Sequence, residues 1–539
     1  MVAMRVQVTD LALSLDEPPD RLRVLAAARL GIAPEDVGPI TIRRRAVDAR
    51  LGRPRHVHTI EADVPLEPGD IAGMRGVSVA VEDRRPPLAP GRKPIRGQPV
   101  VVGAGPAGLF AAWRLSETGY RPILLERGRP VEARRYDTAA FWKRGELDPD
   151  SNVLFGEGGA GAFSDGKLTT RVKDPRRDDV LRALVACGAE ETILYDARPH
   201  LGTDRLPRIL QAMRRRLVEM GTEIRFGARV DDLVLSDGAS PGVVGLLTNQ
   251  GAVETNAAVF AIGHSARDTY AMLLRRGAAM EQKPFAIGVR VQHPQEVIDE
   301  AQYGRAAGMP GLGAAEYVLT CPVTRVGRAV YSFCMCPGGA VIPCATDAGA
   351  VSCNGMSGSR RKGRYANSAI VAQVSPRDYP GPDPLAGIEF QRRWESLAFD
   401  AAGGTYALPV MALSDLVRDR FARRGRVGLA VSSFPRAEIA DLRPLLPGDV
   451  LAAIRQASRS FERPIPGWLG EEAVAFGVET RTSAPLRILR AGDGQSISLV
   501  GLFPAGEGAG YAGGIVSAAV DGLRAAEAII RIHARPGEA

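Results

Sequence analysis

Cysteine pairs of the kind that carry redox or metal chemistry are absent from this sequence. None of the six cysteines lies in a C-x-x-C motif, and the first of them is Cys187. A dithiol–disulfide relay is therefore not expected. The other five, between Cys321 and Cys353, have spacings that match no standard zinc or iron–sulfur ligand pattern. We expect no metal site and interpret these cysteines as small packing residues.

Long apolar runs and a recognisable targeting segment are also missing. The longest uncharged run, residues 329–346, is interrupted by two prolines and two adjacent glycines and is too polar to span a bilayer. The first twenty residues carry an early aspartate and lack a basic stretch followed by an apolar one. We therefore expect a cytoplasmic, reducing location and no membrane partner.

The sequence also lacks a large excess of basic over acidic residues. The 69 basic and 61 acidic residues leave a net charge of +8 over 539 residues, which is mild for a nucleic-acid binder. Only six of the basic residues are lysines. Six arginines cluster between Arg43 and Arg55, most simply as a solvated strand face; the alternative is a surface for a partner or an anionic ligand. Oligomeric state is not predicted.

Glycine, by contrast, is abundant, with 61 residues that gather in short clusters between apolar runs. The clearest cluster is G-x-G-x-x-G at Gly103, Gly105 and Gly108. It follows the apolar run 100–102, which predicts a buried strand, and opens a helix that we expect to end near Gly119. A second strand is expected at 122–125, directly before Glu126.

This spacing predicts a dinucleotide-binding βαβ unit. The first glycine permits a tight turn, the second lets the backbone approach a pyrophosphate, and the third lets helix and strand pack closely. The free N–H groups at the helix N-terminus favour phosphate. The acidic residue that follows the second strand is placed to accept hydrogen bonds from an adenosine ribose.

The form G-A-G-P-A-G-L…E-R-G resembles the two-dinucleotide-binding-domains flavoproteins, in which this unit binds FAD. The segments 259–266 (VFAIGHSA) and 501–529 (GLFPAGEGAG…) resemble two further FAD motifs of that class. The resemblance implies that Glu507, after Gly506, meets the ribityl chain. It also implies that a helix opening at Gly513, Gly514 and Ile515 points its N-terminus at the flavin.

A fourth segment, 151–171 (SNVLFGEGGAGAFSDGKLTTR), makes the resemblance narrower. With segments such as YSFCMCPGG at 331–339 and ETRTSAPLRI at 479–488, the chain is similar to a large bacterial group of FAD-dependent dehydrogenases within the HI0933-like flavoproteins. This resemblance implies an α/β fold with a Rossmann-like FAD-binding domain of the glutathione-reductase type. The isoalloxazine ring is expected between the 155–171 loop and the 506–515 segment.

The expected domain organisation follows from these segments. We predict a small N-terminal α+β module at 1–85, a proline-rich linker at 86–98, and the first part of the FAD-binding domain at 99–280. An inserted α+β substrate domain is expected at 281–424, which reads as irregular with short β-like runs. The FAD-binding domain is expected to finish at 425–539.

The residues expected to contact the cofactor share these motifs. They are Gly103, Ala104, Gly105, Pro106, Ala107, Gly108, Glu126, Arg127, Gly158, Gly159, Ala160, Phe163, Ser164, Lys167, Val230, Ala261, Gly263, His264, Gly506, Glu507, Gly513, Gly514 and Ile515. The candidate catalytic residues are Lys167, His200 and Arg481. Lys167 follows the glycine-rich loop and could polarise a carbonyl, stabilise an anionic flavin or act as an acid or base; the simpler alternative is a surface or phosphate-facing charge.

These features predict an FAD-dependent oxidoreductase that transfers a hydride between a small molecule and flavin N5. No second complete G-x-G-x-x-G unit is present, so NAD(P)H is expected, if at all, as a transient reductant. One alternative is a flavin-dependent reductase of uridine in RNA, docked through the arginine-containing N-terminal module. Another is a protein that binds FAD without catalysis. The substrate is not predicted.

Overall fold

The N-terminal module is a four-stranded antiparallel sheet covered by one helix. The computed structural model describes residues 4–50, 52–80, 85–238, 241–421 and 436–537. In the module, β1 (Met4–Ser14), β2 (Thr41–Asp48), β3 (Arg55–Val64) and β4 (Val77–Val79) pair in the order β2-β3-β1-β4. The helix α1 (Arg21–Leu30) ends at Gly31, whose φ of 70° is the left-handed conformation that glycine adopts without strain.

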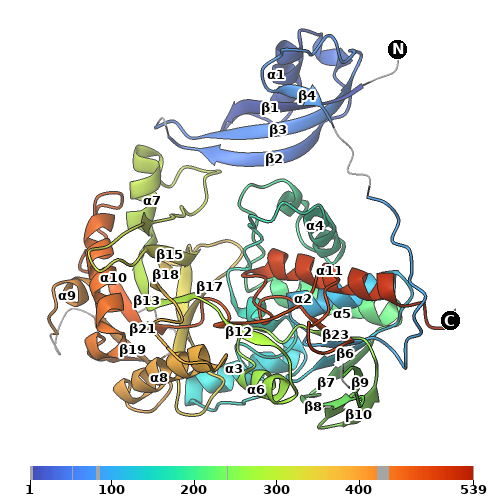
Figure 1. Ribbon diagram of the computed structural model, residues 1–539. Coiled ribbons are helices and arrows are strands. Elements are labelled where there is room, and N and C mark those ends of the chain that lie inside the picture. The colour runs from blue at the N-terminus through green and yellow to red at the C-terminus, as the bar shows by residue number, and fades with distance from the viewer. Residues whose placement is uncertain (1–3, 51, 81–84, 239–240, 422–435, 538–539) are drawn as a thin grey trace.

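In Figure 1 the module is seen above the rest of the chain, which includes α4 (Arg176–Ala186) and α7 (Gln295–Tyr303). Its β2 strand makes one specific contact with the main body. The guanidinium of Arg45 donates to both carboxylate oxygens of Asp196, at 2.8 and 3.1 Å. The backbone N–H of Arg45 donates to the carbonyl of Tyr195. The module is thus joined to the body by a short bridge as well as by the linker.

The linker follows the C-terminal end of the chain rather than crossing open solvent. The N–H of Gly91 donates to the carbonyl of Ile530, and that of Lys93 donates to the carbonyl of Ile532. Figure 1 shows this segment descending to the C-terminus. It connects the module to the parallel sheet.

The parallel sheet has five strands in the order β23-β11-β5-β6-β7. These are β5 (Val100–Val102), β6 (Ile123–Glu126), β7 (Glu223–Phe226), β11 (Ala258–Phe260) and β23 (Leu502–Pro504). The predicted βαβ unit is confirmed: α2 (Pro106–Glu117) connects β5 to β6. A Cβ at Gly108 would lie 1.7 Å from the carbonyl oxygen of Gly103, so only glycine allows this approach of helix and strand.

Helices cover the parallel sheet. α2 packs against α11 (Ile515–Ile532), and the layer is completed by α4 and α5 (Leu206–Glu219). A three-stranded antiparallel sheet of β8 (Val230–Leu235), β9 (Val243–Thr248) and β10 (Gly251–Glu254) flanks it, with α3 (Val131–Arg144) and α6 (Arg267–Arg275). Among the described residues, no helix combines the length and apolar character needed to cross a membrane.

The inserted region is a seven-stranded sheet, which corrects the expectation of an irregular segment. The strand order is β14-β15-β18-β13-β21-β19-β20. The strands are β13 (Phe285–Pro294), β14 (Thr320–Cys321), β15 (Val330–Cys336), β18 (Tyr365–Val374), β19 (Leu408–Ala412), β20 (Ala437–Ile439) and β21 (Val474–Glu479). The central strands β13 and β18 are buried on both faces, so their sequences lack the polar–apolar alternation that predicts a strand.

The predicted boundary between residues 424 and 425 lies outside the described residues. The sheet nevertheless continues beyond it, because β20 and β21 are two of its strands. The helix α10 (Gly448–Phe461) packs in the same hydrophobic core, with α8 (Ala386–Ala401) and α9 (Leu413–Val417) nearby. The insertion therefore extends to about residue 479, and its last strand leads directly into Arg481.

Two short ribbons complete the insertion. β16 (Gly339–Cys344) pairs with β17 (Ser352–Ser357), and β12 (Met280–Gln282) pairs with β22 (Leu486–Ile488). β12 and β22 stand where the chain enters and leaves the seven-stranded sheet. They hold the two crossings between the insertion and the parallel sheet side by side.

A buried histidine in this core makes stability depend on pH. His293 is 1% exposed, its ring lies 4.3 Å from that of Trp468, and its Nε2 donates to the Trp468 carbonyl. Burial lowers the pKa of His293 to about 4. Since the unfolded chain binds a proton near pH 6.5 and the native chain does not, stability is expected to fall as the pH drops from 6.5 to 4.

Between pH 7 and pH 5, this one group is expected to remove about 2 kcal/mol of unfolding free energy. Denaturant titrations of the wild type and of His293→Gln at both pH values would measure it. The variant cannot titrate at this position and should lose correspondingly less stability. Equal losses in the two proteins would contradict the assignment.

Candidate functional site

A cavity of about 430 Å³ lies between the parallel sheet and the insertion. Its walls include the carboxyl ends of β5 and β6, at Val102 and Glu126, where α/β sheets bind their ligands. From there it extends to β15 and β17 of the insertion, through residues 332–336 and 352–355. One continuous space therefore connects the glycine-rich loop with the inserted sheet.

Two helix N-termini open onto this cavity. Gly105 is the N-cap of α2 and Gly514 is the N-cap of α11, and neither helix has a side-chain cap. A Cβ at Gly105 would meet only the Cα of Gly159, at 3.9 Å, and a Cβ at Gly513 or Gly514 would have only open space or the far end of Ser517. The missing side chains leave room for a ligand, and the uncapped N–H groups favour an anionic one.

Glu126 holds this loop region together. One carboxylate oxygen accepts a hydrogen bond from Ala104 N–H at 2.7 Å, and the other accepts from Gly128 and Gly156 N–H at 2.8 and 3.0 Å. A carboxylate offers about four acceptor positions. Three are used by the backbone, so one is left for the ribose contact predicted from the sequence.

The cavity gathers most of the predicted cofactor-binding residues. Those that line it are Gly103, Gly105, Pro106, Ala107, Glu126, Arg127, Gly159, Ala160, Ser164, Lys167, Val230, Ala261, Gly263, His264, Glu507, Gly513, Gly514 and Ile515. The 155–171 loop and the 506–515 segment thus face one space, as expected for a flavin between them.

Five predicted residues lie behind the wall instead of lining it. They are Ala104, Gly108, Gly158, Phe163 and Gly506. The N–H of Gly158 donates to the Ala104 carbonyl, and that of Gly506 donates to Asp521. The Phe163 ring packs against the buried guanidinium of Arg134, at 4.8 Å. These residues shape the loops but do not face the cavity.

The predicted catalytic residues behave differently from one another. Lys167 lines the cavity, but its ammonium donates to the carbonyl of Met335 and so ties the glycine-rich loop to β15. His200 does not line the cavity; its Nε2 donates to the carbonyl of Ser359 at 3.0 Å. Nothing in the cavity's lining supports a catalytic role for His200, whose ring joins two loops.

Arg481 lines the cavity as the centre of a buried ion network. Its guanidinium donates to both oxygens of Glu395, at 2.9 and 2.8 Å, and to Thr346 and Ser265. Glu395 also pairs with Arg267 at 3.0 Å. Burial alone would raise the pKa of the Glu395 carboxyl, but Arg267 and Arg481 hold it at about 2. Arg481 is thus a neutralised, anchored group rather than a free cation.

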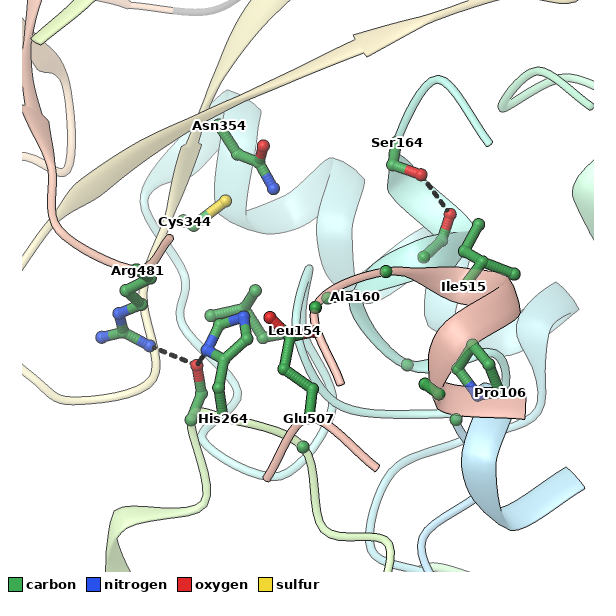
Figure 2. A pocket seen from close by; sticks show the side chains of 18 of the residues that line it. Pro106, Leu154, Ala160, Ser164, His264, Cys344, Asn354, Arg481, Glu507 and Ile515 are labelled. Atoms are coloured by element: carbon green, nitrogen blue, oxygen red, sulfur yellow. Dashed lines mark hydrogen bonds between the residues drawn. The ribbon is translucent and has the colours of Figure 1, made fainter. Parts of the chain in front are cut away.

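His264 and Glu507 point into the cavity near each other (Figure 2). Burial, with the guanidinium groups of Arg481 and Arg267 beside the ring, lowers the pKa of His264 to about 4. Burial raises the pKa of Glu507 to about 7, although Lys283 opposes the shift. Both groups are therefore available in uncharged form near neutral pH.

The insertion supplies walls that sequence motifs did not reveal. Cys344 and Asn354 lie across the cavity from His264 (Figure 2). Behind them, Arg290 is completely buried and donates to Glu479 at 2.9 Å. Four free cysteines, Cys334, Cys336, Cys344 and Cys353, line this end. The described residues contain no group of histidine, cysteine and acidic side chains arranged to hold a metal ion.

The parallel sheet, the glycines that leave room for a ligand (Gly105, Gly513 and Gly514) and the two helix N-termini define a dinucleotide-binding flavoprotein of the α/β class. Comparison with known proteins agrees. Residues 101–136 match a model of NAD(P)-binding Rossmann-like domains, and residues 284–482 match the family described as FAD-dependent protein, C-terminal domain-like. Residues 5–63 match a domain of unknown function.

A protein of unassigned function from Clostridium beijerinckii is 42% identical over 531 residues, which is 98% of this chain and 99% of the relative. The chain belongs to the same family, that of the FAD-dependent proteins, and its cofactor is FAD. The thiamine thiazole synthase of Aeropyrum pernix is 28% identical over 154 residues, 28% of this chain and 45% of that protein.

Solved structures show only a general likeness. The L-proline dehydrogenase of P. horikoshii has a TM-score of 0.34 and 12% identity, covering 81% of this chain and 94% of the other. The glycine oxidase of Geobacillus kaustophilus has a TM-score of 0.31 and 13% identity, covering 81% and 95%.

Proposed function

We propose that this protein is an oxidoreductase that transfers a hydride between a small molecule and the N5 position of FAD. The observation that carries the proposal is the continuity of the cavity. It runs without a break from the FAD cradle at Gly105 and Gly514 to the chamber formed by β15 and β17. A molecule in that chamber would share one enclosed space with the flavin.

FAD, when bound, supplies a two-electron acceptor for a hydride. The chain's residues would hold it extended, with the pyrophosphate on the N-terminus of α2 and the isoalloxazine near the N-terminus of α11. The partial positive charge of that second helix end favours electron density on a reduced flavin. Lys167, held by Met335, would keep the loop and the inserted sheet together around the substrate.

NAD(P)H as a transient reductant, a cytoplasmic location and membership of the HI0933-like group belong to the same proposal. The RNA alternative gains no specific support. Of the arginines between residues 43 and 55, Arg43 pairs with Glu61, Arg45 with Asp196, and Arg50 and Arg55 with Asp48. We therefore favour a small-molecule substrate over a nucleic acid.

The visible spectrum of the purified protein, followed by anaerobic mixing, tests the proposal. We expect a yellow protein whose flavin absorbance bleaches with NADH, NADPH or one member of a panel of amino acids and hydroxy acids. Reduction by light in the presence of EDTA serves as the control that the bound flavin can be reduced. A flavin that this control reduces, but that none of the substrates reduces, would favour the alternative of FAD binding without catalysis.

A further inference from the structure

Most ionisable groups that line the cavity already have partners. The pairs within the described residues are Arg127 with Asp150 and Asp268, Arg229 with Asp231, Asp165 and Glu316 with Arg361, Glu479 with Arg290, and Arg481 with Glu395. Two groups differ. Neither the Glu507 carboxyl nor the Nε2 atom of His264 has a hydrogen-bond partner in the described part of the chain. Both groups are open to a bound molecule.

The hydrogen bonds behind His264 determine where its proton lies. Arg481 Nη1 donates to Ser265 Oγ at 3.1 Å, and this guanidinium cannot accept a hydrogen bond. Ser265 Oγ lies 2.8 Å from Nδ1 of His264 and has no other acceptor among the described residues. Within the described residues, the hydroxyl hydrogen finds an acceptor only if it points at Nδ1. Nδ1 is then an acceptor, and the proton of a neutral ring must be on Nε2.

The charges around the ring keep it neutral. Arg481 and Arg267 lie on one side and oppose protonation, while Glu395, which favours it, is already shared between those two guanidinium groups. Glu507 faces the ring from the other side (Figure 2). A neutral imidazole with its N–H directed into a closed site is a strong, non-titrating hydrogen-bond donor.

We propose that Glu395, Arg481 and Ser265 position His264 as the neutral Nε2-protonated tautomer, whose N–H binds a carbonyl or carboxylate oxygen of the molecule in the cavity. The proposal rests on the proposed function, because that molecule is the substrate or the flavin itself. In this reading, His264 touches the ligand. Arg481, predicted from the sequence as catalytic, is a positioning residue.

The tautomer is tested by ¹⁵N NMR of the FAD-loaded protein labelled at its six histidines, with His264 assigned from the signal lost in His264→Gln. We expect Nδ1 without a proton and Nε2 with one. Ser265→Ala removes the hydroxyl that faces Nδ1 and is expected to produce a mixture of tautomers. Thr346→Ala is the matched control, because Thr346 accepts from the same Arg481 nitrogen but does not reach His264.

A wild-type ring protonated on Nδ1 would contradict the proposed positioning of His264 by Arg481 and Ser265. Equal tautomer changes in Ser265→Ala and Thr346→Ala would contradict it as well. This readout needs no turnover. It therefore stands even if no substrate reduces the flavin, and failure of the proposed function can be told apart from failure of this inference.

The ligand contact is tested with His264→Phe, which has no donor, and His264→Gln, which keeps an N–H. The probes are FAD affinity, the potential of the bound flavin, and acetate binding followed by the flavin spectrum. If the oxygen belongs to FAD, His264→Phe should weaken FAD binding about five- to tenfold or shift its potential. If it belongs to the substrate, acetate binding alone should weaken by that factor. His264→Gln should recover much of either loss; no change in any probe would overturn the contact.

Discussion

Gly105→Asp is expected to yield a folded protein that does not retain FAD. Gly105 lies at φ −76° and ψ −178°, extended backbone that any residue can adopt, and a Cβ there would meet only Gly159 Cα at 3.9 Å. Aspartate is also a good N-cap, and α2 has no side-chain cap. The substitution should therefore leave the apo fold as stable as before, or more stable by a few tenths of a kcal/mol.

The same carboxylate would occupy the place proposed for the pyrophosphate. Its charge would repel the phosphates and would satisfy the N–H groups that would otherwise bind them. We expect FAD affinity to fall at least about a hundredfold, or ~3 kcal/mol. Absorbance of the purified protein, with fluorescence titration of added FAD, measures this.

Gly492→Asp provides the matched control. Gly492 is exposed, and a Cβ there has open space on every side. This variant carries the same added charge away from the cavity and should remain yellow. If Gly105→Asp were equally yellow and fully loaded, the placement of the pyrophosphate on α2 would be wrong.

The βαβ unit could be predicted from the sequence because its constraints are local. The unit lies within one short segment. Gly108 is required by its approach to the Gly103 carbonyl, and Glu126 accepts from the backbone N–H groups of Ala104 and Gly128. The C-terminal segment around Glu507, by contrast, was predicted only through its resemblance to an FAD motif. Local geometry is encoded by local residues.

The ion network behind His264 could not be predicted in this way. Arg267 and Arg481 meet at Glu395, from which they are separated by 128 and 86 residues. No spacing rule relates such positions. Arg481 follows β21, and Glu395 lies on α8, which packs against that strand, while Arg267 opens α6 in the other part of the protein. Only the tertiary fold brings these three elements together.

The inserted sheet could not be predicted from the sequence for a different reason. β13 reads FAIGVRVQHP, with nine buried residues in succession, among them Arg290, Gln292 and His293. Polar side chains inside a buried strand break the apolar run without producing alternation. The sequence therefore resembles a loop, although in the core Arg290 pairs with Glu479 and His293 donates to the Trp468 carbonyl.

Glu479→Gln is expected to cost about 3–5 kcal/mol of unfolding free energy, because it leaves a buried guanidinium without its counter-charge. Arg290 is 0% exposed and donates to Glu479, to the amide oxygen of Asn367 and to the carbonyl of Cys334. An arginine cannot lose its proton to relieve the cost. Denaturant titration of the two proteins at fixed FAD concentration measures the difference.

The reciprocal change, Arg290→Met, is expected to cost less at low pH. Burial already raises the pKa of Glu479, although Arg290 opposes the shift. Without Arg290, this carboxyl would take up a proton in the folded state at a pH where the unfolded chain does not. Stability gained from a raised pKa is lost as the pH rises through the folded value. The deficit of Arg290→Met should therefore shrink as the pH falls from 8 to 5.

The two variants together separate charge from packing. The deficit of Glu479→Gln should not shrink as the pH falls over that range. The raised pKa of Glu479 in the wild type adds stability only toward low pH, and the unpaired guanidinium of the variant does not titrate. If both deficits were small and independent of pH, water rather than Glu479 would compensate the charge of Arg290. If both were large and independent of pH, lost packing would account for them. Only a deficit that shrinks with falling pH in Arg290→Met, and does not shrink in Glu479→Gln, indicates that the ion pair stabilises this wall of the cavity.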